Sequence, residues 1–148
     1  MSALYKTKFD GYEERVRQSL RDQPFMSKLL DVNILRIEPG VVELAIPVTA
    51  QMLQPHGNVH GIVASAVADS AAGYAAQTLL PEGADMVTVE YKINYLAPGI
   101  GERIIAVGKV LRPGRTISIC SADVFAESAG ERKLFAYFVA TMMTVGGN

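Results

Sequence analysis

The stretch Gly61-Ile-Val-Ala-Ser-Ala-Val-Ala-Asp69-Ser-Ala-Ala-Gly-Tyr-Ala-Ala-Gln77 contains seven alanines and one charged residue, Asp69. Alanine is the best helix former, so the stretch predicts a helix from about Gly61 to Leu79. Because the helix has no charged face for solvent, we expect it to be largely enclosed. A carboxylate held there resists ionisation or needs a partner, and such carboxylates concentrate at functional sites. Asp69 is therefore a candidate catalytic residue, with a structural Asp bonded to backbone as the alternative.

The segments around this helix predict a small α+β domain. Val16 and Leu20 form a narrow apolar stripe in a short helix over 12–20. Two β-rich runs, 32–38 and 41–48, flank Pro39-Gly40 and predict a hairpin. Four further strands are expected as an antiparallel meander, over 86–95, 103–111, 116–126 and 133–144. We expect one domain over 1–148, with residues 1–27 as an N-terminal extension.

The first and the last of these four strand segments carry distinct patterns. In the first of the four strands, Val87, Val89 and Tyr91 alternate with Thr88 and Glu90. The last strand is apolar on both faces, so we expect it to lie centrally in the sheet or at a subunit interface.

Composition excludes several classes of function. Of 148 residues, 49% are hydrophobic and 20% charged, with a formal net charge of −1. This balance argues against nucleic acid as the main partner. No apolar run reaches the length of a membrane span, and the N-terminus lacks the apolar core of a signal peptide. Cys120 is the only cysteine, which excludes an internal disulfide and fits a cytoplasmic location.

Known catalytic and metal-binding motifs are poorly represented. The run from Gly57 to Gly61 lacks the Lys and the spacing of a phosphate-binding loop. His56 and His60 are four residues apart, but they straddle Gly57 and Asn58, and no third metal ligand is obvious. No serine lies on a Gly-x-Ser-x-Gly elbow. We therefore expect neither a metal nor another cofactor.

The start of the long helix offers an anion-stabilising group. Free N–H groups at a helix N-terminus favour negative charge on a ligand oxygen, and Gly61 lets a substrate carbonyl approach them. Helical spacing places Ile62, Ser65 and Asp69 on the same side of the helix as Gly61. We expect Asp69, as general base or nucleophile, and the helix start to face one cleft.

The residues around the start of the long helix resemble the motif of a known family. The segment from His56 to Gly61, followed by Ala66-Val67-Ala68-Asp69, is similar to the pattern Asn-x-x-Gly-x-x-His-Gly-Gly-x-x-x-x-x-x-Asp. That pattern is typical of the phenylacetate-pathway type of hotdog-fold acyl-CoA thioesterases. The similarity extends over about 38–145 and includes the segments 87–91, 94–98 and 114–116.

The resemblance implies a fold, an assembly and a set of site residues. The expected fold is the hotdog, a curved antiparallel sheet around a long helix. Two subunits pair their sheets edge to edge and form the active sites between them, and dimers commonly form tetramers. The family's acid corresponds to Asp69, its carbonyl-polarising N–H to Gly61, and its water-positioning hydroxyl to Thr88.

Two positions depart from the family pattern. Gln54 replaces the usual Asn and is one methylene longer, and Ile62 replaces the second Gly of the His-Gly-Gly run, where it could alter access for the acyl group. His60 is expected to be part of the helix-start turn rather than a base. His60 and Ser65 are also candidate substrate contacts. Arg112 and Arg115 are expected either to bind the phosphates of coenzyme A or to be solvated.

Two other functions remain open from the sequence. A non-catalytic acyl-CoA-binding module would show tight binding without turnover. A hotdog hydratase or dehydratase would use His60 and Asp69 as an acid–base pair.

Overall fold

The computed structural model describes residues 4–147, so both ends of the domain predicted over 1–148 lie outside the described residues. Every predicted helix and strand is present, and each end agrees to within two residues. The elements are α1 (Tyr12–Arg21), the π-helical turn η1 (Phe25–Leu29), β1 (Asn33–Glu38), β2 (Val41–Pro47), the 3-10 turn η2 (Ala50–Met52), α2 (Gly61–Gln77), β3 (Ala84–Tyr95), β4 (Arg103–Arg112), β5 (Ile117–Ser128) and β6 (Glu131–Gly146). The turn η1 was not predicted, because five residues leave no periodic pattern.

The six strands form one antiparallel sheet in the order β1-β2-β4-β5-β6-β3. The predicted meander is therefore correct for β4, β5 and β6 and wrong for β3. Instead of pairing with β4, β3 pairs along its length with β6 at the far edge. This places β6 between β5 and β3, which confirms the prediction that the strand apolar on both faces is an inner strand.

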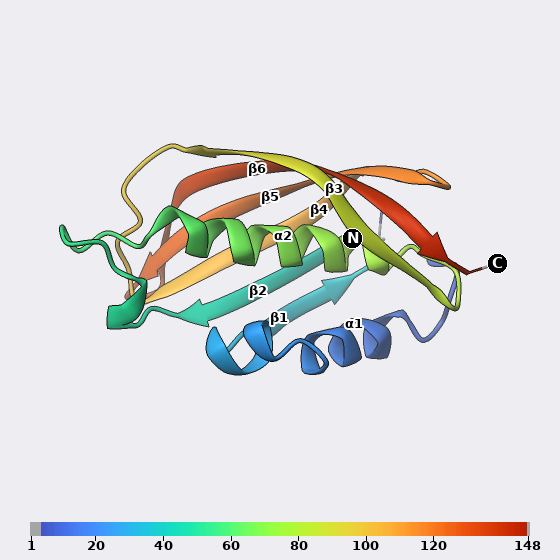
Figure 1. The fold of residues 1–148 in the computed structure, drawn as a ribbon, viewed down its shortest axis with the longest axis horizontal. Helices are drawn as coiled ribbons and strands as arrows, with labels where there is room; N and C mark the ends of the chain where they lie inside the picture. The colour runs from blue at the N-terminus through green and yellow to red at the C-terminus, as the bar shows by residue number, and fades with distance from the viewer. Residues whose placement is uncertain (1–3, 148) are drawn as a thin grey trace.

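Figure 1 shows the sheet curving around α2, with α1 running beside β1. Gly108 of β4 permits the close approach of helix to sheet, because a Cβ at this position would lie 2.1 Å from the Ala71 carbonyl oxygen. The alanines of α2 that face the sheet are fully buried, as is Val67. Small side chains on the helix and a glycine on the strand thus let the two backbones meet directly.

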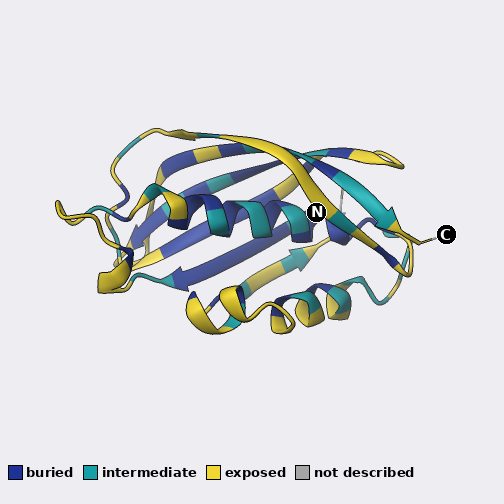
Figure 2. Ribbon diagram, viewed as in Figure 1, coloured by how far each residue is buried: buried dark blue, intermediate teal, exposed yellow. Residues whose placement is uncertain are grey.

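The expectation that α2 is largely enclosed is wrong for one of its sides. Ala66, Asp69, Ser70 and Gly73 are only partly buried, and Ile62 is 69% exposed. These residues follow one another at helical spacing and form the teal and yellow stripe on α2 in Figure 2. Apart from Asp69 and the large Ile62, the side chains on this side of the helix are small and uncharged. The elements α1 and β3 flank the stripe without closing over it.

The edge strand β3 is exposed along most of its length. Val87, Val89, Tyr91 and Tyr95 are each close to half exposed. Natural proteins rarely leave a long apolar edge strand open to solvent, because it offers unpaired backbone groups to another strand. This edge therefore has the properties of a surface that another strand covers.

Candidate active site

Asp69 lies near the middle of α2 and receives a hydrogen bond from β3. The Thr88 hydroxyl Oγ1 donates to Asp69 Oδ1 over 2.7 Å. Both residues line a cavity of about 300 Å³ between α1, α2 and β3. The structure therefore brings together the carboxylate and the hydroxyl that the sequence singled out, although Asp69 is partly exposed rather than buried.

A β-bulge in β3 makes this contact possible. The pairing with β6 shifts register between Thr88 and Glu90. With clean alternation, Thr88 and Tyr95 would point to opposite faces of the sheet. Instead both reach α2, because Thr88 bonds to Asp69 and Tyr95 bonds to the Gly61 carbonyl. The alternation expected along this strand is thus interrupted at the site.

In the described part of the chain, the first turn of α2 leaves the backbone N–H of Gly61 free. The Ile62 N–H donates to His60 Nδ1 over 3.2 Å, and the Val63 N–H donates to the His60 carbonyl over 3.0 Å. Within residues 4–147, the Gly61 N–H has no hydrogen-bond acceptor. His60 is thus the N-cap of the helix, and Gly61 presents the N–H that is available to a ligand oxygen.

Gln54 reaches the helix start through a tight loop. Its N–H donates to the Asn58 carbonyl over 2.7 Å, and Leu53 pairs with Val59 across the loop. Gln54, Gly61 and Tyr95 line a second cavity of about 280 Å³. Gln54 and Gly61 therefore lie beside the same cavity.

The two halves of the expected site do not meet within one chain. Asp69 and Thr88 line one cavity, whereas Gln54 and Gly61 line the other. Eight residues of helix separate Gly61 from Asp69, which corresponds to about 12 Å along the axis. Within one chain, Asp69 and the helix start therefore line different cavities, because a shared side of a helix does not bring residues two turns apart together.

Comparison with known proteins identifies the family. Residues 56–133, more than half of the chain, match the family described as the thioesterase superfamily. The chain belongs to the thioesterase superfamily.

Individual relatives agree with this assignment. A crystal structure of a thioesterase family protein from Silicibacter pomeroyi is similar with a TM-score of 0.87 and 41% identity, over 93% of this chain and 100% of that one. Acyl-coenzyme A thioesterase PaaI from Escherichia coli is 27% identical over 122 residues, which are 82% of this chain and 83% of that protein. Acyl-coenzyme A thioesterase 13 from Homo sapiens is 24% identical over 119 residues, 80% of this chain and 84% of that protein. The resemblance and the hotdog fold inferred from the sequence are confirmed, and the protein is a thioester hydrolase.

Several residues beside the candidate site were missed in the sequence. Ser19, Asp22 and Gln23 come from the end of α1 and the residues after it, and they form a wall of the Asp69 cavity. The sequence indicated only an amphipathic helix here, with nothing to place its polar end against α2. Tyr95, which contacts both Gly61 and Ser65, was also missed as a site residue.

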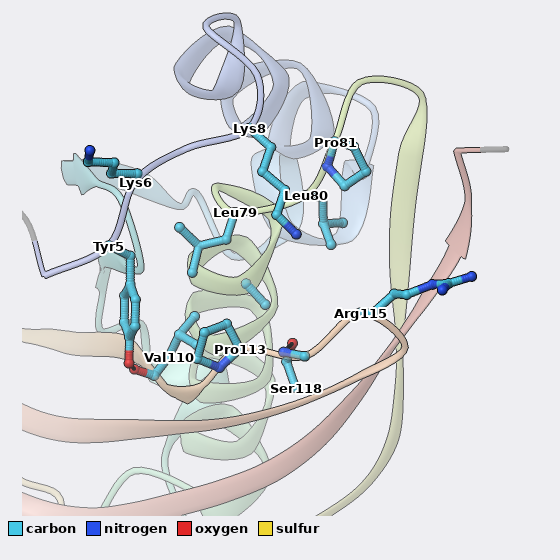
Figure 3. A pocket seen from close by; sticks show the side chains of 12 residues that line it. Tyr5, Lys6, Lys8, Leu79, Leu80, Pro81, Val110, Pro113, Arg115 and Ser118 are labelled. Carbon is cyan, nitrogen blue, oxygen red and sulfur yellow. Dashed lines mark hydrogen bonds between the residues drawn. The ribbon is translucent and has the colours of Figure 1, made fainter.

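Of three predicted substrate contacts, one lies beside Gly61 and two lie elsewhere. Ser65 is buried and shares a hydrogen bond of 3.2 Å with Tyr95, which lines the Gly61 cavity. Arg115 lines a separate cavity of about 260 Å³ at the far end of α2, beside Lys8 and Leu79. Figure 3 shows the Arg115 side chain extending away from Lys8. Arg112, the last residue of β4, is exposed.

Two further observations bear on the other expectations. Across the described part of the chain, no three His, Cys, Asp or Glu side chains come together as a metal site would require. The same residues include no helix long and apolar enough to cross a membrane.

Proposed function

We propose that this thioesterase hydrolyses the thioester of an acyl-CoA to a free acid and coenzyme A, with Asp69 as nucleophile or general base. The observation that carries the proposal is the 2.7 Å hydrogen bond from Thr88 to Asp69 in an open cavity. A hydroxyl that donates to one carboxylate oxygen fixes the rotamer of that carboxylate. The other oxygen, Oδ2, has no hydrogen-bond partner among the described residues and is the proposed reactive atom.

The reaction needs a carboxylate, an oxyanion contact and a leaving thiolate. Asp69 Oδ2 either attacks the thioester carbonyl carbon or takes the proton of an attacking water. The carbonyl oxygen, which becomes negative, binds the free Gly61 N–H. The C–S bond then breaks. In the general-base route, Asp69 passes the proton that it took from water to the leaving thiolate, so that coenzyme A leaves as the thiol. In the nucleophile route, the acyl group forms a mixed anhydride with Asp69, and a water that hydrolyses this anhydride releases the free acid and supplies the proton of the thiol. A thioester is electrophilic enough that these groups suffice, with Gln54 and Thr88 as positioning residues.

We further propose that each active site combines two copies of the chain. A nucleophile and an oxyanion donor that act on one carbonyl each lie about 3 Å from it, so they are at most about 6 Å apart. Gly61 and Asp69 of one chain are about 12 Å apart along the helix. Pairing of two β3 edges would cover the exposed apolar residues and bring Gly61 of one copy against Asp69 of the second copy. A homodimer is then the minimal active unit, and a tetramer is compatible with it.

The geometry disfavours the hydratase alternative. His60 Nδ1 accepts the Ile62 N–H, so the neutral ring carries its proton on Nε2 and presents a donor there rather than a base. His60 and Asp69 are also nine residues apart, about 13 Å along the helix. An acid–base pair needs its members on the same substrate atoms.

The test is release of free thiol from a panel of aromatic and straight-chain acyl-CoAs. Wild type should be active, and Asp69→Asn should lose at least about a hundredfold in kcat, because an amide is neither nucleophile nor base. Asp123→Asn, on the opposite face of the sheet beside Lys109, is the matched control. Burial raises the pKa of Cys120 to about 12, so the protein's own thiol does not contribute to the readout.

Two outcomes would contradict the proposal. Wild-type rates in Asp69→Asn would remove Asp69 from the mechanism. Thermal stabilisation by acyl-CoA without turnover by the wild type would favour the non-catalytic binding module.

A further inference from the structure

Tyr95, at the end of β3, contacts the first turn of α2 through its hydroxyl. Its Oη donates to the Gly61 carbonyl over 2.8 Å and lies 3.2 Å from Ser65 Oγ. A phenol has a single proton, which here goes to Gly61, so the Ser65 hydroxyl is the donor to Tyr95. The three groups form a chain that runs from Ser65 through Tyr95 to the backbone of Gly61.

The Tyr95 ring also covers the glycine. A Cβ built on Gly61 would lie 2.6 Å from Cζ and Oη of Tyr95. The ring therefore occupies the space that a side chain at position 61 would need. Position 61 therefore needs a glycine for packing against Tyr95, in addition to the space that an approaching substrate needs.

Together, His60 and Tyr95 hold one peptide group from both ends. The Gly61 carbonyl and the Ile62 N–H belong to the same peptide; the carbonyl binds Tyr95 Oη, and the N–H binds His60 Nδ1. Glycine has more backbone freedom than any other residue. The free Gly61 N–H belongs to the preceding peptide, and φ and ψ of Gly61 set its direction relative to the peptide that His60 and Tyr95 hold. Fixing that second peptide narrows the ψ range of this glycine and so restricts the direction of the N–H.

We propose that Tyr95 is a positioning residue that aims the Gly61 N–H at the thioester oxygen, with Ser65 orienting the Tyr95 hydroxyl. This inference rests on the proposed function, in which that N–H stabilises the oxyanion. A preorganised donor is worth more in the transition state than one that must be ordered during the reaction. The ring of Tyr95 forms a wall of the cavity that Gln54 and Gly61 also line, so it shapes the passage to this donor.

Tyr95→Phe tests the proposal, because it keeps the ring and removes the two hydrogen bonds. We expect kcat to fall about tenfold while KM changes less than about twofold, since the N–H acts mainly on the transition state. Ser65→Ala should lower kcat less, and its effect should disappear in the Tyr95→Phe background. Tyr137→Phe, on the opposite face of the sheet and without a hydrogen bond from its hydroxyl among the described residues, should match wild type.

The mobility of the Gly61 N–H gives a readout that does not depend on activity. In protein labelled with 15N-glycine, the NMR order parameter of the Gly61 N–H should be lower in Tyr95→Phe than in wild type. A lowered melting temperature with unchanged kcat and an unchanged Gly61 order parameter would show that Tyr95 only stabilises the fold, and would overturn the inference. If wild type hydrolyses no acyl-CoA, the proposed function fails, while the order parameter still decides whether Tyr95 restrains Gly61.

Discussion

Thr88 contributes a single hydrogen bond to the site, and that bond can be removed without changing shape. Thr88→Val replaces the hydroxyl with a methyl group, so Asp69 loses its donor and its fixed rotamer. A hydrogen bond to a charged group contributes about 1.5–3 kcal/mol, which predicts a fall in kcat of about tenfold to a hundredfold. Thr88→Ser keeps the donor and should retain most of the rate. Steady-state kinetics with one acyl-CoA compares the three proteins, and a fully active Thr88→Val would remove Thr88 from the mechanism.

At this scale the sequence predicted part of the candidate site. Asp69 was visible because a lone carboxylate among alanines is conspicuous, and Thr88 followed from the family resemblance. Tyr95 was not visible, because its role depends on a hydroxyl that crosses from β3 to α2. The distance between Gly61 and Asp69 could have been counted from helical rise, yet a shared helix side suggested one cleft. A contact between segments far apart in the sequence leaves no local pattern in either segment, so a single sequence does not reveal it.

His60 connects the helix start to the loop before it, and its N-cap role makes a prediction at the level of α2. His60→Ala removes the acceptor of the Ile62 N–H and should lower the free energy of unfolding by about 1 kcal/mol. His60→Asn supplies another good N-cap and should restore it. Urea unfolding measures both. Because His60 is not the base in the proposed mechanism, His60→Asn should keep most of its thiol-releasing activity; an inactive, stably folded His60→Asn would reopen the hydratase reading.

Ion pairs connect three neighbouring strands of the sheet through Glu127. Glu127 of β5 accepts hydrogen bonds from Arg103 of β4 and Arg132 of β6, and these lower the pKa of its carboxyl group. A carboxyl whose pKa is lower in the folded state stabilises the fold above its ordinary value of 4.5 and loses that contribution as pH falls through the folded value. Glu127→Gln should therefore weaken the dependence of unfolding free energy on pH below this value.

Urea unfolding of Glu127→Gln and wild type across pH 7 to about pH 3 measures the difference. Glu131→Gln, at the exposed first residue of β6, is the control and should follow wild type. Parallel curves for Glu127→Gln and wild type would show that the two arginines do not stabilise the ionised Glu127.

The pairing of β3 with β6 shows where element-level prediction ended. The hydrophobic patterns located every strand, because alternation and turn residues are local signals. They did not give the strand order. The chain crosses from β3, at one edge of the sheet, to β4, with β6 and β5 lying between the two strands, and this crossover leaves no pattern in either strand. The bulge at Thr88 was equally invisible, although it decides which residues of β3 face the helix. Local patterns specify elements, while pairing depends on which faces bury well together.

At the scale of the whole molecule, the proposed dimer predicts that two inactive chains can complement each other. Asp69→Asn keeps Gly61, and Gly61→Ala keeps Asp69 but forces a Cβ against the Tyr95 ring. Each homodimer should be inactive. A heterodimer has one site with both defects and one site with neither, if each site takes Gly61 from one copy and Asp69 from the other.

Co-expression with two different affinity tags allows this heterodimer to be purified. It should release thiol at about half the wild-type rate, because one of its two sites is intact. If the two groups acted within one chain, both sites of the heterodimer would carry a defect and no activity would return. The pairing of Asp69→Asn with Gln54→Ala is a second combination for the case in which Gly61→Ala does not fold. Recovery of activity would place the reaction between two subunits. The long apolar edge of β3 would then be explained as the surface that the second subunit covers.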